Sequence, residues 1–445
     1  MEISIPPLFT TLRVNETEQV DSVIKELEAK LKILYSANGY SEAPVIFQHS
    51  QLKSTIVIPT LYQDIMHSYP PVIVDHGCGM AVLRGADVFV PGILCMPTGV
   101  QVGDKVSVCA DIGGSCLRGM TRYEGQMLFV GNGVMLKSRN DIFKGNNITK
   151  GSGIRMECPI FLSLCLNDVL PSKIFAQNLP SIIVGHVLNP QEGDIVLDMC
   201  AAPGGKTSHI VSLLRGRGRL VAVDRSSSKV EKIKQNAAKL GQMADVLTVF
   251  TADSRKLCSD DSGDKSEENK FSSSYFDKIL LDAPCSALGQ RPKCWLENQS
   301  NVNKMKNIKS YPALQRQLFN TAVRLLKPGG TLVYSTCTTT VDENEGLVEW
   351  ALDKHPCLKL SQHTPHIGGT GRQEVTNLSP SNLHSLQYFT PGSPVTCVQE
   401  HHNVHTIPKL SNNVPSLTNL LDLEAECNQD SIGFFIAKFI KSNES

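Results

Sequence analysis

The stretch that decides the fold is VLDMCAAPGGKT, residues 196–207. Its apolar beginning predicts a buried β-strand, its glycine pair predicts a tight turn, and the residues after the turn predict the start of a helix. In an open α/β sheet such a turn lies at the carboxyl end of a strand, where nucleotide-like ligands bind. The spacing is neither that of a P-loop nor that of a GxGxxG dinucleotide motif, so both of these sites are excluded.

Two further segments end in chemically reactive side chains. FDKILLDAPC, residues 276–285, ends in the carboxylate of Asp282 and the thiol of Cys285. TLVYSTC, residues 331–337, ends in the thiol of Cys337. Because the carboxyl ends of parallel strands meet at one edge of a sheet, we expect these side chains and the glycine turn in one cleft.

The composition is that of an ordinary globular protein with two or three domains. The chain has 445 residues, of which 41% are hydrophobic and 19% charged, and no apolar run of about 20 residues predicts a membrane span. The formal net charge is zero, which neither supports nor excludes nucleic acid as a partner, since a local basic face is enough. The 14 cysteines form no CxxC pair, and the first residues lack a signal-peptide pattern. We therefore expect reduced thiols in a cytoplasmic or nuclear protein.

The hydrophobic pattern divides the chain into three parts. Residues 1–69 are predicted to form an N-terminal α/β segment, with a helix over 16–34. Residues 70–150 contain short β-like runs broken by glycines, such as MAVLRGADVFVPG from residue 80, which predict a small β-barrel. Residues 151–445 alternate strands and helices, which predicts an α/β fold with a parallel sheet covered on both faces. The strands are expected near 194–199, 219–224, 246–251, 277–282, 331–336 and 432–439, and the helices near 205–215, 227–240, 311–326 and 341–354.

Two segments lack a regular hydrophobic pattern. Residues 259–275 are polar and of low complexity, which predicts a disordered loop. Residues 361–414 are rich in proline, serine, asparagine and histidine and are predicted to be irregular.

The motifs DMCAAPGGKT, DAPCS and YSTCT, in this order, resemble those of the Nol/Nop/Sun family of RNA cytosine-5 methyltransferases. The resemblance covers about residues 151–445, with an echo in FTTLRVN at 9–15. Residues 70–150 also resemble a PUA domain, an RNA-binding barrel, through LRGADVFVPG at 83–92 and a GNG turn at 131–133. A PUA domain is typical of the branch that acts on the acceptor end of transfer RNA. The resemblance implies a Rossmann-like class I methyltransferase sheet, a small N-terminal α/β subdomain and an inserted PUA domain.

The cofactor expected from this pattern is S-adenosylmethionine. Asp224 ends the predicted strand LVAVD, and a carboxylate there accepts both hydroxyls of a ribose. Asp253 ends the next strand and is expected to accept from the adenine amine, although a helix N-cap is the alternative role of each acid. By resemblance the cofactor contacts are Cys200, Ala201, Ala202, Pro203, Gly204, Gly205, Lys206, Asp224, Asp253 and Asp282.

The two thiols fit methyl transfer to carbon 5 of cytosine. That carbon is a poor nucleophile, and addition of a thiolate at C6 makes it enamine-like. The adduct must then lose the C5 proton and expel the thiol, so two cysteines permit a division of labour. The residues alone leave open which cysteine attacks, and each one alone also fits a buried structural thiol. The resemblance implies that Cys337 is the nucleophile and that Cys285 helps to release the product.

Other side chains complete the expected catalytic site. Asp282 would bond the N3/N4 edge of the base, and Lys206 would reach a base oxygen or the Asp282 carboxylate. The target base must leave any stack, and Phe434 is expected either to line its pocket or to pack in the core. No metal is expected, because the chemistry needs none and the HHxxH histidines lack a supporting carboxylate. These histidines are His401, His402 and His405.

RNA, most of all transfer RNA, is the expected partner. In the barrel, Arg84 and Arg118 offer charge, Phe89 offers a stacking face, and Asn132 lies in a turn where a nucleic-acid backbone could run.

Three positions depart from the family pattern. Leu117 replaces one of two adjacent lysines, Ala287 replaces a glycine after DAPC, and Tyr388 replaces an arginine. Losing basic contacts weakens phosphate affinity without altering the chemistry, so substrate specificity is less determined than methyl transfer.

Two other function classes stay open on the residues alone. One is a catalytically silent RNA-binding paralogue, which the intact Cys285, Cys337, Asp282 and Lys206 argue against. The other is a methyltransferase of small molecules or proteins, which explains neither the thiols nor the barrel. A monomer is expected, and whether messenger RNA is also a substrate stays open.

Overall fold

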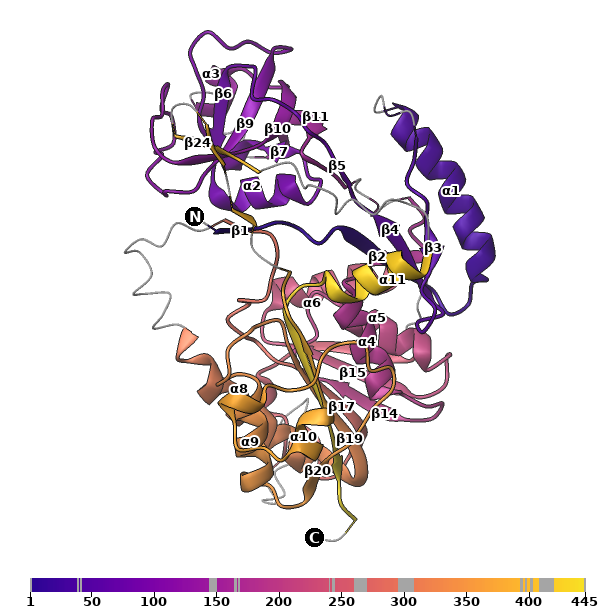
Figure 1. Cartoon of the computed structure of the whole chain (residues 1–445). Helices are drawn as coiled ribbons and strands as arrows, with labels where there is room; N and C mark the ends of the chain where they lie inside the picture. The colour runs from indigo at the N-terminus through magenta and orange to yellow at the C-terminus, as the bar shows by residue number, and fades with distance from the viewer. Residues whose placement is uncertain are drawn as a thin grey trace.

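The computed structural model shows a β-rich upper domain, an N-terminal sheet with a long helix beside it, and a larger α/β domain below them (Figure 1). It describes residues 2–37, 40, 42–143, 150–163, 166, 169–239, 241, 245–259, 270–294, 308–392, 395–396, 398–400, 403–407 and 420–443. Within these ranges, no helix has the length and apolar character needed to cross a membrane.

The α/β domain is built on one large sheet. Its strands are β14 (Ile195–Asp198), β15 (Arg219–Asp224), β16 (Leu247–Thr251), β17 (Phe276–Asp282), β19 (Leu326–Thr336), β20 (Leu358–Leu360), β21 (Leu386–Phe389) and β25 (Phe434–Lys441). The order is β16-β15-β14-β17-β19-β25-β20, the first five strands are parallel, and β25 is antiparallel to β19. The order in which the strands are added to the sheet reverses between the neighbouring strands β14 and β17, and ligands bind at such a switch point. The predicted parallel sheet is confirmed.

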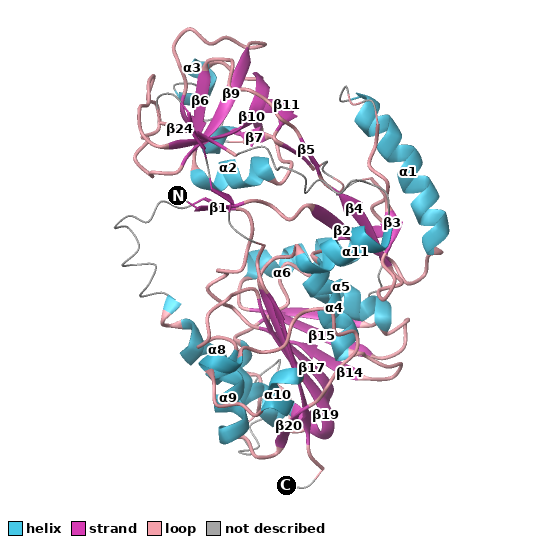
Figure 2. Cartoon of the chain, viewed as in Figure 1, coloured by secondary structure: helices cyan, strands magenta, loops and turns pink. Residues whose placement is uncertain are grey.

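Helices cover both faces of this sheet (Figure 2). They are α4 (Leu179–Leu188), α5 (Gly205–Leu213), α6 (Ser227–Lys239), α8 (Tyr311–Leu325) and α9 (Glu345–Lys354). On one face α4 packs Ile183 into a core with Val333, and on the other α8 packs Phe319 with Tyr334. The sequence analysis missed α4 because eight of its ten residues are buried, so it lacks the polar face that marks a surface helix.

The N-terminal sheet lies between the other two parts. Its strands are β2 (Phe9–Val14), β3 (Phe47–Gln48), β4 (Thr55–Pro59) and β13 (Ile174–Ala176), in the order β13-β2-β4-β3. The helix predicted over 16–34 is α1 (Val20–Ala37), which buries Val23, Leu27 and Leu31. Because β13 pairs with β2, this sheet takes a strand from beyond residue 69.

The upper domain is an eight-stranded sheet. Its strands are β6 (Pro71–Val74), β7 (Val88–Phe89), β8 (Ile93–Cys95), β9 (Lys105–Asp111), β10 (Met127–Met135), β11 (Ser152–Pro159), β23 (Val398–Glu400) and β24 (Val404–Thr406). The strand β11 pairs with β10, so the sheet extends past residue 150, where the sequence analysis ended it. The strand β24 runs parallel to β10 and comes from the C-terminal part of the chain.

One expected strand of this domain is a helix. The run from Met80 to Leu83 was predicted to be β-like, but it belongs to α2 (His76–Leu83). The carboxylate of Asp75 caps this helix by accepting from Cys78 N at 2.8 Å. A short apolar run does not distinguish a strand from a buried helix, and the cap decides here.

The two segments predicted to be irregular are partly ordered. Of the loop 259–275, residues 260–269 lie outside the described part of the chain, but Phe271 packs against Phe276 and bonds Leu257 O through its N–H. Residues 361–414 include β21, β24 and α10 (Pro380–His384). Both predictions were wrong for these stretches, because a few buried aromatic and apolar side chains outweigh a polar composition.

A buried arginine joins the N-terminal sheet to the α/β domain. Arg13, 1% exposed on β2, donates to Gln177 Oε1 at 3.0 Å and to Ser208 Oγ of α5 at 2.8 Å. Its guanidinium also lies 5.6 Å from the ring centre of Phe175. Burial lowers the pKa of Arg13 to about 9, so the hydrogen bonds must offset the cost of enclosing this charge.

We expect Arg13→Ala to lower the free energy of unfolding by about 3 kcal/mol, because it removes charge-assisted hydrogen bonds and leaves a cavity. Urea unfolding monitored by circular dichroism measures this. The control is Arg122→Ala, whose side chain is 83% exposed and whose loss should change stability by less than about 0.5 kcal/mol. Equal unfolding midpoints for the two variants would contradict the role of Arg13.

Candidate active site

The glycine turn after β14 is shaped by steric limits at two positions. Gly204 precedes α5 with φ of 103°, a conformation that other residues rarely adopt. A Cβ added there would lie 3.0 Å from Ile233 Cα, and one added at Gly205 would lie 3.2 Å from Phe175 Cε1. The turn therefore needs both glycines to pass between α6 and the strand β13.

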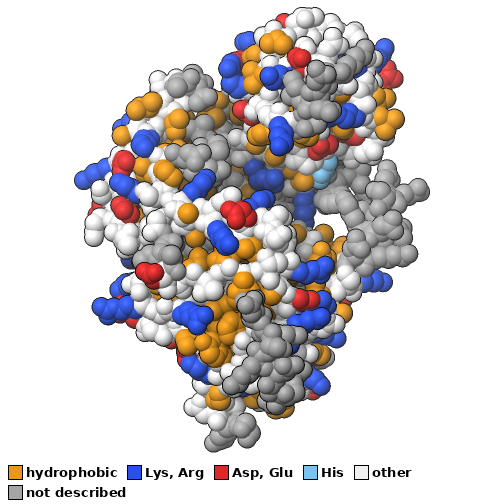
Figure 3. Space-filling model, turned by 180° about the vertical axis from the view of Figure 1, so that it is seen from behind, with side chains coloured by type: hydrophobic (Ala, Val, Ile, Leu, Met, Phe, Trp, Pro, Cys, Tyr) orange, Lys and Arg blue, Asp and Glu red, His pale blue; other side chains and the backbone are white. Residues whose placement is uncertain are grey.

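A cavity of about 740 Å³ opens at this turn. The sheet edge supplies Asp198, residues 200–203, Gly205, Lys206 and Asp282. The N-terminal sheet supplies residues such as Phe9 and Thr11, and the upper domain supplies Arg84–Ala86. Figure 3 shows lysine and arginine side chains in the hollow between the upper domain and the α/β domain. All three parts of the molecule thus form the walls of one site.

An orphaned carboxylate oxygen lies in the wall of this cavity. Asp198 Oδ2 accepts from Thr207 Oγ1 at 2.8 Å, whereas its buried Oδ1 has no hydrogen-bond partner. Burial raises the pKa of Asp198 to about 7. A buried acid with an unused oxygen fits a cationic ligand group, which would supply the missing partner. Asp198 lies within the VLDMCAAPGGKT motif, but the motif alone did not predict this role.

The two predicted acidic contacts have different environments. Asp224 accepts from Ala202 N at 3.3 Å and from Ser226 N at 3.0 Å, which holds the carboxylate against the turn. Asp253 caps the short helix that follows it. Arg255 binds both oxygens of the Asp253 carboxylate, and its shortest hydrogen bond runs from Nη2 to Oδ2 at 2.5 Å. This bond to Arg255 lowers the pKa of Asp253. Neither acid lines the cavity, so their contacts with the cofactor remain predictions.

The two cysteines lie side by side, as the strand ends predicted. Cys285 Sγ and Cys337 Sγ are 3.4 Å apart. The Cys285 thiol and the Gln290 side chain bond the Cys337 sulfur and lower the pKa of Cys337 to about 7. The same contact with Cys337, together with burial, strongly raises the pKa of Cys285. Cys337 is therefore the thiol of the pair that ionises first, and it is partly ionised at neutral pH, while Cys285 keeps its proton.

An ion pair lies next to the thiols. Lys206 Nζ is 2.7 Å from Asp282 Oδ2, and Ser335 Oγ donates to Asp282 Oδ1 at 2.7 Å. Both carboxylate oxygens are thus fixed by neighbours on α5 and β19. The Lys206 ammonium lies 5.2 Å from the ring centre of Phe434, which is 1% exposed. Phe434 therefore packs in the core, the alternative to lining the pocket.

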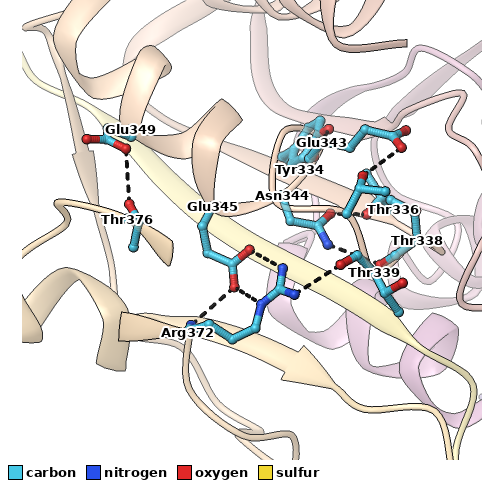
Figure 4. A network of polar contacts seen from close by, with 11 residues as sticks. Tyr334, Thr336, Thr338, Thr339, Glu343, Asn344, Glu345, Glu349, Arg372 and Thr376 are labelled. Atoms are coloured by element: carbon cyan, nitrogen blue, oxygen red, sulfur yellow. Dashed lines mark hydrogen bonds and ion pairs between the residues drawn. The ribbon is translucent and has the colours of Figure 1, made fainter. Parts of the chain in front are cut away.

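A buried polar network holds the loops that carry the thiols, and the sequence analysis missed it. Glu343, 1% exposed, accepts from Ser286 Oγ at 2.6 Å and from Gln315 Nε2 at 2.9 Å. Its neighbour Asn344 bonds Thr336 Oγ1 at 2.6 Å, as Figure 4 shows. The DENE run at 342–345 was the available signal, since adjacent acids buried after a strand need dedicated partners.

The three departures from the family pattern have different structural settings. Leu117 is 70% exposed. Ala287 has φ of 55°, a left-handed conformation in which alanine costs about 1 kcal/mol more than glycine. The ring of Tyr388 lies 4.4 Å from the Arg372 guanidinium, which also binds both oxygens of Glu345 (Figure 4).

The predicted RNA contacts of the upper domain do not lie together. Arg84 is exposed and lines the cavity together with Lys206, and Phe89 is 53% exposed on β7. Arg118 instead donates to Pro91 O at 2.9 Å and Ile93 O at 2.8 Å, so its guanidinium ties loops of the sheet together. Asn132 is engaged too: it donates to Met66 O at 3.0 Å and accepts from Ser107 Oγ at 2.8 Å.

No group of three or more histidine, cysteine or acidic side chains that could hold a metal ion occurs among the residues that the structure describes. Of the three HHxxH histidines, His401 and His402 lie outside the described residues, and His405 bonds Gln126.

A parallel sheet with a glycine turn at its switch point is the architecture of a class I methyltransferase, and here an acid and a pair of thiols lie at the same edge. Residues 185–391 match the family model of the 16S rRNA methyltransferases RsmB/F. The human tRNA (cytosine(72)-C(5))-methyltransferase NSUN6 is 44% identical, over 99% of this chain and 90% of its own. The chain therefore belongs to the NSUN6-like branch of the RNA cytosine-5 methyltransferases.

The comparison extends to Pyrococcus horikoshii. Its tRNA (cytosine(72)-C(5))-methyltransferase is 33% identical, over 74% of this chain and 76% of its own. The crystal structure of NSun6 from the same organism with SFG, an S-adenosylmethionine analogue, has a TM-score of 0.70 at 26% identity. It covers 99% of this chain and 92% of that one.

S-adenosylmethionine is the cofactor, and the cavity fits it. The cofactor supplies an electrophilic methyl group on a sulfonium, and its amino acid end carries an ammonium group. Among the described residues of the cavity wall, Asp198 Oδ1 is a buried polar atom without a hydrogen-bond partner. The ammonium group of the cofactor would supply that partner.

We expect the affinity for S-adenosylmethionine to rise with pH and to level off above about pH 7. The pKa of Asp198 is raised to about 7, so below that pH a proton must leave before the carboxylate can bind a cation. Well below pH 7 the affinity should fall about tenfold per pH unit. Isothermal titration calorimetry between pH 5.5 and 8.5 would measure this.

The matched variants are Asp198→Asn and Asp224→Asn. The first should weaken binding and remove the pH dependence, because no proton is left to release. The second should weaken binding by loss of a ribose acceptor while the pH dependence persists. A wild-type affinity that stays constant across this range would rule out Asp198 as the cation partner.

Proposed function

We propose that this enzyme methylates C5 of a cytosine near the acceptor end of transfer RNA. The main support is the thiol pair, whose sulfurs lie 3.4 Å apart next to Lys206 and Asp282, an ion pair in the wall of the cofactor cavity. The human, mouse and Pyrococcus relatives are named for cytosine 72 of transfer RNA, and the human and mouse enzymes match 99% of this chain. A catalytically silent paralogue would have no need of a thiolate held ready in this way.

The chemistry starts at Cys337. Its thiolate adds to C6 of the cytosine, the new C–S bond forms, and the ring electrons move toward C5. Asp282, held by Lys206 and Ser335, is oriented to accept a hydrogen bond from the amino edge of the base. The fixed charges need no rearrangement when charge develops on the ring, which lowers the barrier.

Cys285 acts in the second half of the reaction. As long as Cys337 is a thiolate, Cys285 stays protonated, because its thiol bonds the charged sulfur. Addition to C6 removes this charge, and the cause of the raised pKa disappears with it. Once C5 has received the methyl group, Cys285 can lose its proton to water and, as a thiolate, accept the C5 proton. The C5–C6 double bond then re-forms, the C–S bond breaks, and Cys337 leaves as a thiolate.

We further propose that the upper domain, residues 71–159 with β23 and β24, is a PUA domain and binds the end of the RNA. Arg84 supports this, because its exposed side chain lines the cavity that Lys206 also lines. The exposed ring of Phe89 offers a stacking face. Reduced cysteines favour a cytoplasmic or nuclear protein, and we propose that it acts as a monomer.

Cys337→Ala should abolish methylation and any covalent complex with RNA, because it removes the sulfur that adds to C6. Cys285→Ala should still add to C6 but release slowly, so a protein–RNA complex that resists denaturation should accumulate with cofactor present. Denaturing gel electrophoresis with radiolabelled transfer RNA distinguishes the two. An adduct formed by Cys337→Ala would mean that Cys337 is not the nucleophile. The absence of an adduct with Cys285→Ala would mean that Cys285 is not the release group.

Arg84→Ala should weaken RNA affinity and flatten its salt dependence by about one counterion, since one phosphate contact is lost. Arg118→Ala provides the comparison within the same domain: it should lower the melting temperature without changing the salt slope, because its guanidinium serves the fold. RNA binding measured across salt concentrations gives the salt slope of each variant, and thermal unfolding gives the melting temperature. Equal slopes for wild type and Arg84→Ala would mean that Arg84 touches no phosphate.

A further inference from the structure

The 3.4 Å spacing of the two sulfurs depends on two loops that follow different strands. Cys285 follows β17, and Cys337 follows β19 directly. The side chains of two consecutive residues, Glu343 and Asn344, reach these loops from the start of α9, and they are 1% and 0% exposed. One buried pair of neighbours in the sequence thus contacts both thiol loops.

Glu343 holds the loop of Cys285 on both sides of the thiol. Its carboxylate accepts from Ser286 N at 3.0 Å and from Ser286 Oγ at 2.6 Å. Gln315 Nε2, on α8, donates to the same carboxylate at 2.9 Å and to Pro284 O at 3.0 Å. The residues before and after Cys285 are therefore tied to one carboxylate, either directly or through one amide.

Asn344 holds the loop of Cys337 in the same manner. Thr336 Oγ1 donates to Asn344 Oδ1 at 2.6 Å, and Asn344 Nδ2 donates to Thr338 O at 3.0 Å (Figure 4). Thr336 and Thr338 are the residues before and after Cys337, and both are buried. A single amide thus fixes the chain on both sides of the second thiol.

These side chains serve the thiol loops at a cost to other contacts. Asn344 is the N-cap of α9, where an asparagine usually accepts from a backbone N–H, but within the described part of the chain its side chain caps nothing. Gln315 is buried, and its Oε1 has no hydrogen-bond partner among the described residues. An unsatisfied buried oxygen lowers stability, so stability alone does not explain this amide.

The reaction gives a reason for a fixed sulfur spacing. One thiol adds to C6 and the other acts at C5 of the same ring, so both sulfurs must stay in reach of two bonded atoms. Tyr334 Oη donates to Glu343 O at 2.7 Å, which anchors the backbone that carries both Glu343 and Asn344. The two thiol loops are therefore positioned from one anchored segment.

We propose that Glu343 and Asn344 are positioning residues of methyl transfer, one for each thiol. Glu343 sets the place of Cys285, and Asn344 sets the place of Cys337. They act through the cysteines and need not touch RNA or cofactor. This inference rests on the roles proposed above for the two cysteines.

The first test compares Glu343→Met with Glu343→Gln in the full chain. The methionine loses every hydrogen bond of the carboxylate, so release should slow about tenfold and the adduct that resists denaturation should accumulate, as for Cys285→Ala. The glutamine should restore most of the lost rate. Glu343 Oε2 accepts only from the N–H groups of Ser286 and Gln315, and Oε1 only from the hydroxyl groups of Ser286 and Thr340. An amide can place its oxygen at the first position and its NH₂ at the second, because a hydroxyl group also accepts.

The second test is Asn344→Leu, which has nearly the same shape. It should slow formation of the adduct about tenfold without accumulation, because the attacking sulfur is the one displaced. The control is Thr376→Val, which removes a bond to Glu349 of α9 and leaves the thiol loops untouched (Figure 4). It should react like the wild type. Single-turnover reactions with radiolabelled transfer RNA, sampled on denaturing gels, give the rates of formation and release.

Each variant is judged by its likeness to the cysteine variant that it should resemble. Wild-type rates for Glu343→Met and Asn344→Leu, or the same defect in both, would overturn the proposal. So would a Glu343→Gln enzyme as slow as Glu343→Met, since the charge would then matter, or a raised KM at an unchanged single-turnover rate. If Cys285→Ala forms no adduct, the proposed role of Cys285 fails by itself, and Glu343→Met must then share the defect that Cys285→Ala shows. Where Glu343→Met or Asn344→Leu does not fold, Gln315→Leu and Thr336→Val replace them under the same criteria.

Discussion

The active site depends on the parallel pairing of β14, β17 and β19. Leu280 pairs with Asp198 on one side and with Val333 on the other, and two residues later Asp282 pairs with Ser335. This register brings the cofactor turn and both thiol loops to one edge, although they are far apart in the sequence. A slip of one residue would turn every side chain of a strand to the opposite face, so Asp282 would no longer face Lys206. The buried helices on both faces of the sheet prevent such a slip.

The parts of this arrangement that follow a local rule could be predicted from the sequence. Strand ends are marked by polar residues after an apolar run, so Asp282, Cys285 and Cys337 were placed correctly at one edge. The glycine turn was visible because its backbone demands that residue type. The residues alone could not decide which cysteine is the nucleophile, because the pKa of Cys337 is lowered by hydrogen bonds from Cys285 and Gln290. That is a property of the assembled site and not of either motif.

Other features depend on contacts between distant segments and were therefore missed. Arg118 reads as a surface cation in the sequence, but carbonyl groups of a neighbouring loop surround it in the structure. The helix α4 has no polar face, and α2 is decided by a single capping carboxylate. Glu343 looks like an ordinary acid in a polar run, yet it is buried and holds the backbone of Ser286 beside the thiol loop. The partners of Arg118 and Glu343 lie too far along the chain for periodicity to reveal them, whereas α2 and α4 were missed because an apolar run alone does not mark a buried helix.

The way the chain is threaded through the upper domain has a mechanical consequence. The chain enters this sheet at β6, leaves after β11, and returns more than two hundred residues later to add β23 and β24. The domain is thus fastened to the rest of the molecule at widely separated points, unlike a module on a single tether. The fold therefore fixes the distance between Arg84 in this domain and the Cys337 sulfur in the α/β domain. If the upper domain binds the end of the RNA as proposed, this fixed span selects an RNA whose cytosine lies at the matching distance from that end.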